Sequence, residues 1–283
     1  MGLAGTVAAP GAVPSRRSRG IYLLPNAFTT GGLFAGFFAI VMAMNDRFET
    51  ASIAIFVAML LDSLDGRVAR MTNTQSAFGE QYDSLADMVS FGAAPALVMY
   101  AWTLQGLGKW GWVAAFVYVA GAALRLARFN TNIGVVDKRF FQGLPSPAAA
   151  AMVAGLIWVV TDLRETRWIT ADRQDLAWVA WLVTIYAGVT MVTNMPFYSF
   201  KDLNLKRSVP FIFLVLLVLG FVLISSDPPV VLFLLFVVYG VSGYALWGWR
   251  RYRANGLSVM RRSPSAGAAD PARASDSRQP PAQ

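Results

Sequence analysis

The sequence contains no cysteine and no histidine, and charged residues make up only 14% of its 283 residues, against 56% hydrophobic residues. Soluble domains carry about 25% charged residues, and the mean hydropathy of +0.49 is too high for a soluble chain of this length. The two missing residue types exclude disulfide scaffolds, thiol nucleophiles, zinc sites of the usual ligand set and Ser-His-Asp catalysis. The composition therefore predicts an all-α, polytopic membrane protein that uses carboxylates, cations, hydroxyl groups or a hard metal ion.

Apolar segments of the length that a bilayer requires recur along the chain. Residues 1–20 form a basic segment rich in Ala, Gly and Pro, and residues 253–283 lack apolar periodicity, so both tails are predicted to be disordered. The first apolar stretch is too long for a signal peptide and no cleavage site follows it, so we expect a retained helix. The sequence predicts about eight transmembrane helices: 21–44, 50–68, 84–104, 109–129, 147–162, 177–195, 208–225 and 229–249.

The distribution of Lys and Arg predicts the orientation of these helices. With eight spans, the two tails and the connections on their side carry 19 of the 24 Lys and Arg residues, and the opposite side carries five. Because cytoplasmic segments are enriched in these residues, both termini are expected in the cytoplasm. The net charge of +8 then reflects topology and an affinity for anionic lipids. Nucleic-acid binding is excluded as a main function because no soluble basic domain is predicted.

Four aspartates stand where a bilayer penalises charge most. Asp62 and Asp65 interrupt the second apolar segment, whose uninterrupted part, residues 51–61, is too short to cross a membrane. Asp83 and Asp87 open the third segment after a polar connection. Spacings of three and four residues put each pair on one face of its helix. Two acidic stripes are therefore predicted to face each other at the mouth of two antiparallel helices.

Divalent cations would relieve the repulsion between these carboxylates. Oxygen ligands without His or Cys select Mg²⁺, Mn²⁺ or Ca²⁺, and two metal ions that share carboxylates suit phosphoryl displacement. The alternative is a structural ion-pair network of the aspartates with Arg67 and Arg70. Small residues beside the aspartates either permit close helix contact or leave room for a ligand against the backbone; they are Gly66, Ala69 and Gly79.

The complete pattern resembles the signature of the CDP-alcohol phosphotransferases at every fixed position: Asp62-x2-Asp65-Gly66-x2-Ala69-Arg70-x8-Gly79-x3-Asp83-x3-Asp87. The resemblance implies a six-helix catalytic core, assigned to residues 21–205, with two additional transmembrane helices in residues 206–252. It implies Mg²⁺ or Mn²⁺, as two ions, bound by Asp62, Asp65, Asp83 and Asp87, with Asp87 also acting as the general base. The residues implied in CDP-diacylglycerol binding are Asn26, Thr29, Asp62, Gly66, Ala69, Arg70 and Gly79.

Four further segments are similar to bacterial members of this superfamily that form phosphatidylserine: residues 22–30, 127–130, 140–147 and 194–201. This similarity implies transfer of the phosphatidyl group from CDP-diacylglycerol to the hydroxyl group of L-serine, with release of CMP. It also implies an enzyme of the bacterial inner membrane, with its site at the cytoplasmic boundary, and a homodimer. Gly32 departs from the pattern, in which Asn is expected, and forms with Gly36 a Gly-x3-Gly spacing typical of a helix packing contact.

Serine needs a cation for its carboxylate and an acceptor for its ammonium group. The candidates on the cytoplasmic side are Arg125, Arg128, Asn130, Lys138 and Arg139. Arg128 and Asn130 could equally cap the end of the fourth helix. Residues 142–147 predict a turn that opens the fifth helix, with Ser146 as its cap and Pro147 at its first helical position.

Two other functions are compatible with these residues. A sister enzyme of the superfamily would use glycerol 3-phosphate or an inositol phosphate, which the same cations could bind. A cation transporter would use the membrane aspartates as an ion site. Transporters often have repeated halves, and the sequence contains no second copy of the aspartate pattern. Release of CMP from CDP-diacylglycerol distinguishes both enzymes from a transporter.

Overall fold

The computed structural model describes residues 23–72, 74, 76–131, 140–166, 168, 172–198 and 211–260. Two of the predicted acceptor residues, Lys138 and Arg139, lie outside the described residues, as do the predicted tail 1–20 and most of the predicted tail 253–283.

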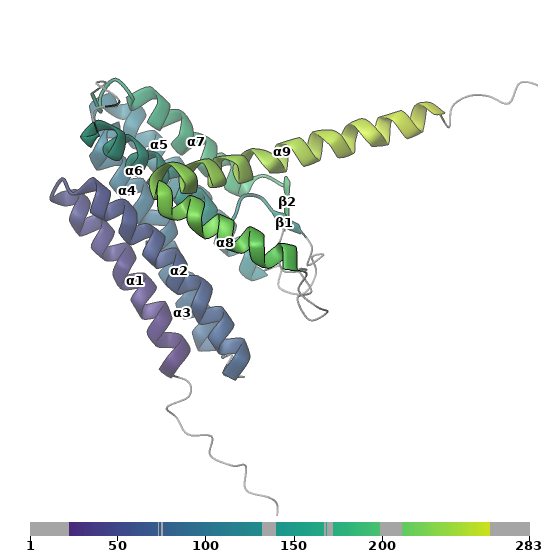
Figure 1. Ribbon diagram of the computed structural model, residues 1–283, viewed down its shortest axis with the longest axis horizontal. Coiled ribbons are helices and arrows are strands. Elements are labelled where there is room, and N and C mark those ends of the chain that lie inside the picture. Colours follow the sequence, from purple (N-terminus) through teal and green to yellow (C-terminus); the bar gives the residue numbers. More distant parts are fainter. Residues whose placement is uncertain are drawn as a thin grey trace, which may run out of the picture.

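Most of the described chain is helical, as the composition predicts, and every predicted apolar segment forms a helix (Figure 1). Two short turns occur between helices: the π-helical turn η2 (Met88–Ala93), which joins α3 and α4 into one rod, and the 3-10 turn η3 (Leu104–Leu107). The helices are α1 (Leu23–Met44), α2 (Phe48–Thr72), α3 (Ala77–Asp87), α4 (Ala94–Trp102), α5 (Lys109–Thr131), α6 (Ser146–Glu165), α7 (Ala177–Val192), α8 (Phe211–Ser226) and α9 (Pro228–Met260).

Five helices of the described chain are long and apolar enough to cross a membrane. They are Pro25–Met44, Ala77–Trp102, Lys109–Thr131, Ser146–Glu165 and Pro228–Arg253. The helix α2 is long enough but carries several charged residues, and α7 and α8 are apolar but only 16 residues long each. The membrane-protein class therefore follows from the structure, and the count of eight spans stays a prediction.

The helix α6 lies at the centre of the bundle. It is the most deeply buried of the long apolar helices, and its first turns consist largely of alanine. These small side chains allow α2, α4, α7 and α9 to pack against it. The helices α5 and α7 cross with Gly121 against Gly188, where an added Cβ atom at Gly121 would meet the Gly188 carbonyl oxygen. The core is thus built from close backbone contacts between helices.

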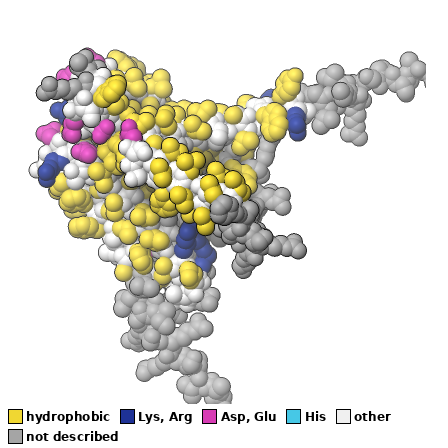
Figure 2. Space-filling view, in the orientation of Figure 1, with side chains coloured by type: hydrophobic (Ala, Val, Ile, Leu, Met, Phe, Trp, Pro, Cys, Tyr) yellow, Lys and Arg dark blue, Asp and Glu magenta, His cyan; other side chains and the backbone are white. Residues whose placement is uncertain are grey.

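Three connections meet at one end of the bundle. Thr103, after α4, donates a hydrogen bond to the Arg173 carbonyl oxygen over 2.7 Å. The Arg173 guanidinium lies 3.9 Å from the Asp46 carboxylate, between α1 and α2, and over the ring of Phe48. Figure 2 shows acidic side chains gathered at this end. These three connections are among the four that the eight-span prediction puts on the side opposite the termini.

A short antiparallel ribbon is an element that the sequence did not predict. Strand β1 (Phe140–Gln142) pairs with β2 (Pro196–Tyr198), in the register Phe140 to Tyr198 and Gln142 to Pro196. The ribbon holds the residues that precede α6 beside those that follow α7. Tyr239 of α9 donates a hydrogen bond to the Tyr198 carbonyl oxygen over 3.2 Å. The helix α9 therefore covers the ribbon.

The last two helices differ in burial from the rest. Nearly every described side chain of α8 is exposed and apolar, and Figure 2 shows this hydrophobic face. The helix α9 packs on α6 and β2 with its first half, and its second half projects from the body (Figure 1). It continues to Met260, into the predicted tail. Arg251 and Arg253 lie over the rings of Trp247 and Trp249, at spacings of four residues that support the helix there.

Candidate active site

The four predicted aspartates lie on two neighbouring helices beside α1. The helix α2 continues past Asp62 and Asp65 to Thr72, as the length of its apolar part requires. The helix α3 begins with Ser76 as its N-cap, whose hydroxyl oxygen accepts a hydrogen bond of 3.0 Å from the Gly79 backbone N–H. This cap starts α3 two turns before Asp83 and so fixes where the second acidic stripe begins.

The structure brings the two stripes together. Asp62, Asp83 and Asp87 each offer a carboxylate oxygen, and these oxygens lie within 4.8 Å of one another. Asp65 lines the same small cavity and is only 6% exposed. Its Oδ2 atom accepts a hydrogen bond of 2.8 Å from the Thr29 hydroxyl group on α1. All four predicted metal ligands therefore border one space between α1, α2 and α3.

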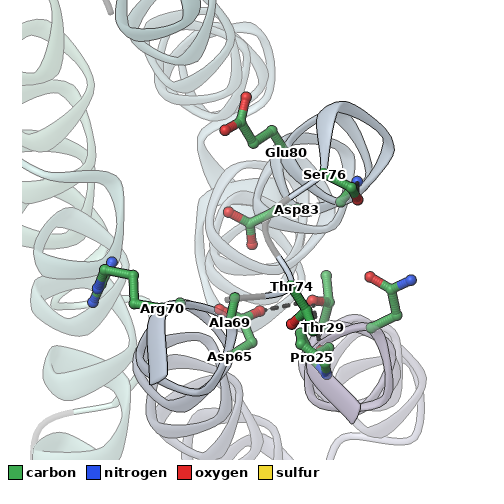
Figure 3. Close-up of a pocket in the computed structure, with 12 residues that line it drawn as sticks. Pro25, Thr29, Asp65, Ala69, Arg70, Thr74, Ser76, Glu80 and Asp83 are labelled. Carbon is green, nitrogen blue, oxygen red and sulfur yellow. Dashed lines mark hydrogen bonds between the residues drawn. The ribbon is translucent and has the colours of Figure 1, made fainter. Parts of the chain in front are cut away.

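The ion-pair alternative is not what the structure contains. Among the described residues, no Lys or Arg side chain lies within ion-pair distance of the four carboxylates. Figure 3 shows Arg70 extending from α2 on the side away from Thr29. Carboxylates gathered without a paired cation repel one another, and an all-oxygen donor set fits a hard divalent cation. The cluster could thus hold a metal ion; the identity and number of ions stay predictions.

A pocket of about 210 Å³ lies beside the cluster (Figure 3). Since one water occupies about 30 Å³ of liquid, this volume is that of a ligand group and not of a packing gap. The pocket is lined by eight residues that the sequence singled out and by four that it did not. The former are Asn26, Thr29, Asp65, Gly66, Ala69, Arg70, Gly79 and Asp83, and the latter are Pro25, Thr74, Ser76 and Glu80.

The glycines near the aspartates have two different roles. A Cβ atom added at Gly66 would meet only the guanidinium nitrogens of Arg70, at 3.5 and 4.0 Å, and no neighbouring helix. A Cβ atom added at Gly36 would lie 2.6 Å from the Ser90 Cα atom. Gly36 therefore makes the predicted helix packing contact. The surroundings of Gly66 favour the other interpretation of small residues, room for a ligand.

Arg125 reaches from α5 to the start of α6. Its Nη1 atom donates a hydrogen bond of 2.7 Å to the Ser146 hydroxyl group, and its charge interacts with those of Asp87 and Asp62. The predicted cap of α6 is wrong: Pro145 is the N-cap residue, and Ser146 and Pro147 are the first two helical residues. Because the Ser146 hydroxyl group accepts from Arg125, its oxygen is engaged across the bundle instead of at the helix end.

Arg128 is occupied by the protein. Its guanidinium donates five hydrogen bonds of 2.9 to 3.3 Å. Four go to the backbone carbonyl oxygens of Gln142, Met191, Val192 and Thr193, and one goes to the side-chain amide oxygen of Asn194. These bonds tie the end of α7 to the ribbon. They favour a helix-capping role for Arg128 over binding of the acceptor substrate. The helix that Arg128 caps is α7, however, and not α5, which carries it.

Asn130 contacts the carboxylate-bearing helix. Its amide nitrogen donates a hydrogen bond of 3.0 Å to the Ser84 hydroxyl group on α3. Sequence reasoning missed Ser84, as it missed the bond between Arg125 and Ser146. In both pairs the partners come from different helices, and a hydroxyl residue in a helix gives no signal of a distant partner. Ser76 could have been found, because Ser before a helical segment is a cap signal.

Comparison with known proteins agrees with this geometry. The sequence model of the family described as CDP-alcohol phosphatidyltransferase matches residues 22–193. Several relatives are named CDP-diacylglycerol–serine O-phosphatidyltransferase. The one from Helicobacter pylori (strain ATCC 700392 / 26695) is 35% identical over 222 residues, which cover 78% of this chain and 90% of the relative.

Two other organisms provide relatives of the same name. The protein of Mycobacterium leprae (strain TN) is 30% identical over 230 residues, 80% of this chain and 74% of the relative. That of Methanocaldococcus jannaschii is 30% identical over 190 residues, 67% of this chain and 82% of the relative. The family match contains α1 to α7 and all four aspartates, and this chain belongs to the CDP-alcohol phosphatidyltransferase family.

Proposed function

We propose that this protein transfers the phosphatidyl group of CDP-diacylglycerol to the hydroxyl group of L-serine, forming phosphatidylserine and CMP. The observation that carries the proposal is the carboxylate cluster of Asp62, Asp83 and Asp87, within 4.8 Å, beside a pocket lined by the other signature residues. Serine is favoured as the acceptor because the relatives that cover most of this chain are named for it.

In this proposal the pocket binds the CDP group of the donor. Asn26, Thr29, Gly66 and Gly79 line it with two polar side chains and two positions that lack bulk. A pyrophosphate can therefore approach the α2 backbone at Gly66. Ala69 and Arg70 continue the same wall. The acyl chains stay in the bilayer while the pyrophosphate reaches the carboxylate cluster.

Asp62, Asp65, Asp83 and Asp87 would hold Mg²⁺ or Mn²⁺, as one or two ions. When bound, a divalent cation supplies positive charge for the pyrophosphate and for the departing CMP. The hydrogen bond from Thr29 holds one oxygen of Asp65, which leaves the other oxygen for a ligand. Within the described residues the four carboxylates have no Lys or Arg partner at ion-pair distance, which is consistent with a site for external cations.

Asp87 acts as the general base. It takes the proton of the serine hydroxyl group while the hydroxyl oxygen bonds to the phosphorus that carries diacylglycerol. The bond from this phosphorus to the CMP oxygen breaks, and CMP leaves with the electron pair. A carboxylate is a weak base for an alcohol, so the proton moves late in the attack and positioning supplies much of the rate enhancement.

Arg125 binds the serine carboxylate in this proposal. Only one of its five N–H groups donates to a described residue, Ser146. The positive charge of the guanidinium also interacts with the negative charge of Asp87. Asn130 contributes near the amine, with Lys138 and Arg139 as further candidates. Arg128 acts indirectly, because it holds the segment before Ser146 in place.

The proposed site lies at the cytoplasmic boundary of a bacterial inner membrane, and both termini lie in the cytoplasm. The Lys and Arg distribution supports this orientation, since 19 of the 24 residues lie on the side of the termini. This position lets a lipid donor enter from the bilayer and a soluble acceptor enter from the cytoplasm.

An acceptor assay tests the proposed function. Purified protein is incubated with CDP-diacylglycerol and Mg²⁺ or Mn²⁺, and CMP is measured with L-serine, glycerol 3-phosphate or an inositol phosphate. We expect CMP with L-serine alone. CMP only with a phosphorylated polyol would assign a sister activity, and no CMP with any acceptor would contradict the enzyme assignment and favour ion transport.

Asp87→Asn is expected to lower the rate of CMP release by at least about a hundredfold, because an amide cannot accept the proton. Asp227→Asn is the matched control. Asp227 is exposed at the start of α9, where its carboxylate accepts a hydrogen bond of 3.2 Å from the Val230 N–H, and Asn caps a helix equally well. Substantial turnover in Asp87→Asn would remove Asp87 from the role of base.

A further inference from the structure

The helix that carries Asp83 and Asp87 is interrupted directly after Asp87. Pro95 has no backbone N–H, so it cannot donate to the carbonyl oxygen of Phe91, four residues earlier. Its ring also crowds that carbonyl group. The chain responds with the π-helical turn η2, in which the Ala94 N–H donates to the Val89 carbonyl oxygen, five residues earlier. Because residue 95 is proline, the Phe91 carbonyl oxygen has no α-helical partner four residues later.

Tyr118 replaces that partner. Its hydroxyl group donates a hydrogen bond of 3.0 Å to the Phe91 carbonyl oxygen. Both residues are buried, Tyr118 at 0% and Phe91 at 1% exposed. A buried carbonyl group without a hydrogen bond is costly, so this bond stabilises the backbone at Phe91, which lies within the π-helical turn.

A second hydrogen bond holds the other side of the turn. The Ser90 hydroxyl group donates to the Gly32 carbonyl oxygen on α1 over 3.1 Å, and Ser90 is 2% exposed. Gly36 leaves the space that brings the α1 backbone against Ser90. The turn is therefore clamped between α1, through Ser90, and α5, through Tyr118.

The clamped turn determines where the carboxylate of Asp87 lies. Asp87 is the residue before the turn and is the N-cap residue of η2. A π-helical turn adds one residue to the helical repeat, so it rotates the preceding residues by about 100° relative to those that follow. A change in the geometry of this turn would therefore rotate Asp87 and Asp83 relative to Asp62.

We propose that Tyr118 is a positioning residue for the reaction: through the Phe91 carbonyl group it holds the π-helical turn that directs Asp87 and Asp83 toward the carboxylates of α2. The proposal rests on the proposed function, since Asp87 is the base there. Tyr118 itself does not line the pocket or the cavity of the aspartates. It acts on the turnover step and not on substrate binding.

Tyr118→Phe removes the hydroxyl group and keeps the ring. Tyr186→Phe is the matched control, because the Tyr186 hydroxyl group also donates to a helical carbonyl oxygen, that of Gly240, over 3.0 Å. Tyr186 lies between α7 and α9, away from the aspartates. Both variants lose one hydrogen bond, so a merely structural role predicts equal effects in the two.

The measurements are kcat and KM for L-serine and CDP-diacylglycerol, and Mn²⁺ affinity by electron paramagnetic resonance. For Tyr118→Phe we expect kcat to fall by about tenfold, the loss that corresponds to one hydrogen bond, with KM values within about twofold. Mn²⁺ affinity should fall by up to about tenfold. For Tyr186→Phe we expect wild-type kcat and Mn²⁺ affinity. An equal fall of kcat in the two variants, or a loss confined to KM, overturns the proposal.

Two further outcomes have defined meanings. If the wild type releases no CMP with any acceptor, the proposed function fails, and the Mn²⁺ affinities decide: weaker binding in Tyr118→Phe than in Tyr186→Phe supports the positioning role, and equal binding overturns it. If Tyr118→Phe does not fold, Ser90→Ala tests the same turn from the side of α1, with the same measurements and the same criteria.

Discussion

Thr29 is the residue that orients one carboxylate of the cluster. Its hydroxyl group lies 2.8 Å from the Asp65 Oδ2 atom and 3.2 Å from the Pro25 carbonyl oxygen. A Thr hydroxyl group has a single proton, so the shorter contact to a charged acceptor is the stronger one. Asp65 is thus held by a residue of another helix, as ligands of metal sites commonly are.

Thr29→Val tests this role. The substitution keeps the shape of the side chain and removes the hydrogen bond, so Mn²⁺ affinity and turnover should each fall by about 10- to 100-fold. Thr30→Val is the control, because the Thr30 hydroxyl group is exposed and contacts only the Tyr82 hydroxyl group and its own helix. Titration with Mn²⁺ compares the metal affinities of the two variants. Equal affinities would show that Thr29 does not support the site.

Arg125 and Arg128 show how far one residue type can differ in role within a single helical turn. Among the described residues Arg125 donates a hydrogen bond only to Ser146, which leaves four of its N–H groups for a ligand or solvent. Arg128 donates to five acceptors of the protein. Both were equal candidates in the sequence. Their roles differ because the acceptors of Arg128 come from the end of α7 and from the ribbon, whose meeting point no local pattern reveals.

Among the elements, the crossing of α5 and α7 depends on two glycines. A Cβ atom at Gly121 would overlap the Gly188 carbonyl group, and one at Gly188 would lie 2.8 Å from the Tyr118 Cα atom. In a membrane, helices gain little from hydrophobic exclusion, so such close backbone contacts supply much of the packing. The same crossing carries Tyr118, which reaches the π-helical turn.

Gly121→Ala should therefore lower the free energy of unfolding by about 1–3 kcal/mol, the usual cost of overpacking. Gly220→Ala is the control, since Gly220 lies on α8 and a Cβ atom there would meet nothing within 4 Å. Thermal unfolding in detergent compares the two variants. A Gly121→Ala variant as stable as Gly220→Ala would mean that α5 and α7 can separate without loss.

The π-helical turn between α3 and α4 is a second feature of the helices that depends on their packing. An uninterrupted helix from Ala77 to Trp102 satisfies the apolar pattern, and the sequence predicted one span there. Pro95 shows that a backbone hydrogen bond must be lost, but it does not show that a π-helical turn and the Tyr118 hydroxyl group compensate for it. That outcome depends on α5 lying against the turn.

For the whole molecule, α9 is part of the folded body and not only an appended span. Tyr186 of α7 donates to the Gly240 carbonyl oxygen over 3.0 Å, and the hydroxyl groups of Thr190 and Tyr244 lie 2.9 Å apart. The Gly243 backbone lies against the ring of Phe197 in the ribbon. The sequence supplied no role for the last two helices, and these contacts give α9 one: it holds α7 and the ribbon against α6.

A chain that ends at residue 205 should consequently be less stable than one that ends at residue 260. The three hydrogen bonds to α9 account for about 3 kcal/mol, and the exposed surface of α6 adds to the loss. We expect a lower unfolding temperature and reduced CMP release for the shorter chain, measured in detergent micelles. Equal stability and activity of the two chains would show that α8 and α9 are accessory.

The sequence by itself determined the class of protein, the family and the four aspartates. The class follows from the lack of charge along the whole chain, and the family and the aspartates follow from carboxylates at fixed helical spacing within one short segment. It also predicted the alternation of the connections, because charge bias acts on each connection separately. Pocket residues such as Asn26 and Thr29 were identified through the family resemblance.

Only the tertiary structure decided which residues support that site. Thr29 meets Asp65, Tyr118 meets the Phe91 carbonyl group, and Arg128 meets the end of α7 across distances of 27 to 65 residues in the chain. Such bonds depend on how the helices cross, and many crossings satisfy the same apolar pattern. The ribbon arises for the same reason, since two three-residue strands have no periodicity of their own. Local spacing specifies the carboxylates, and helix packing specifies what holds them.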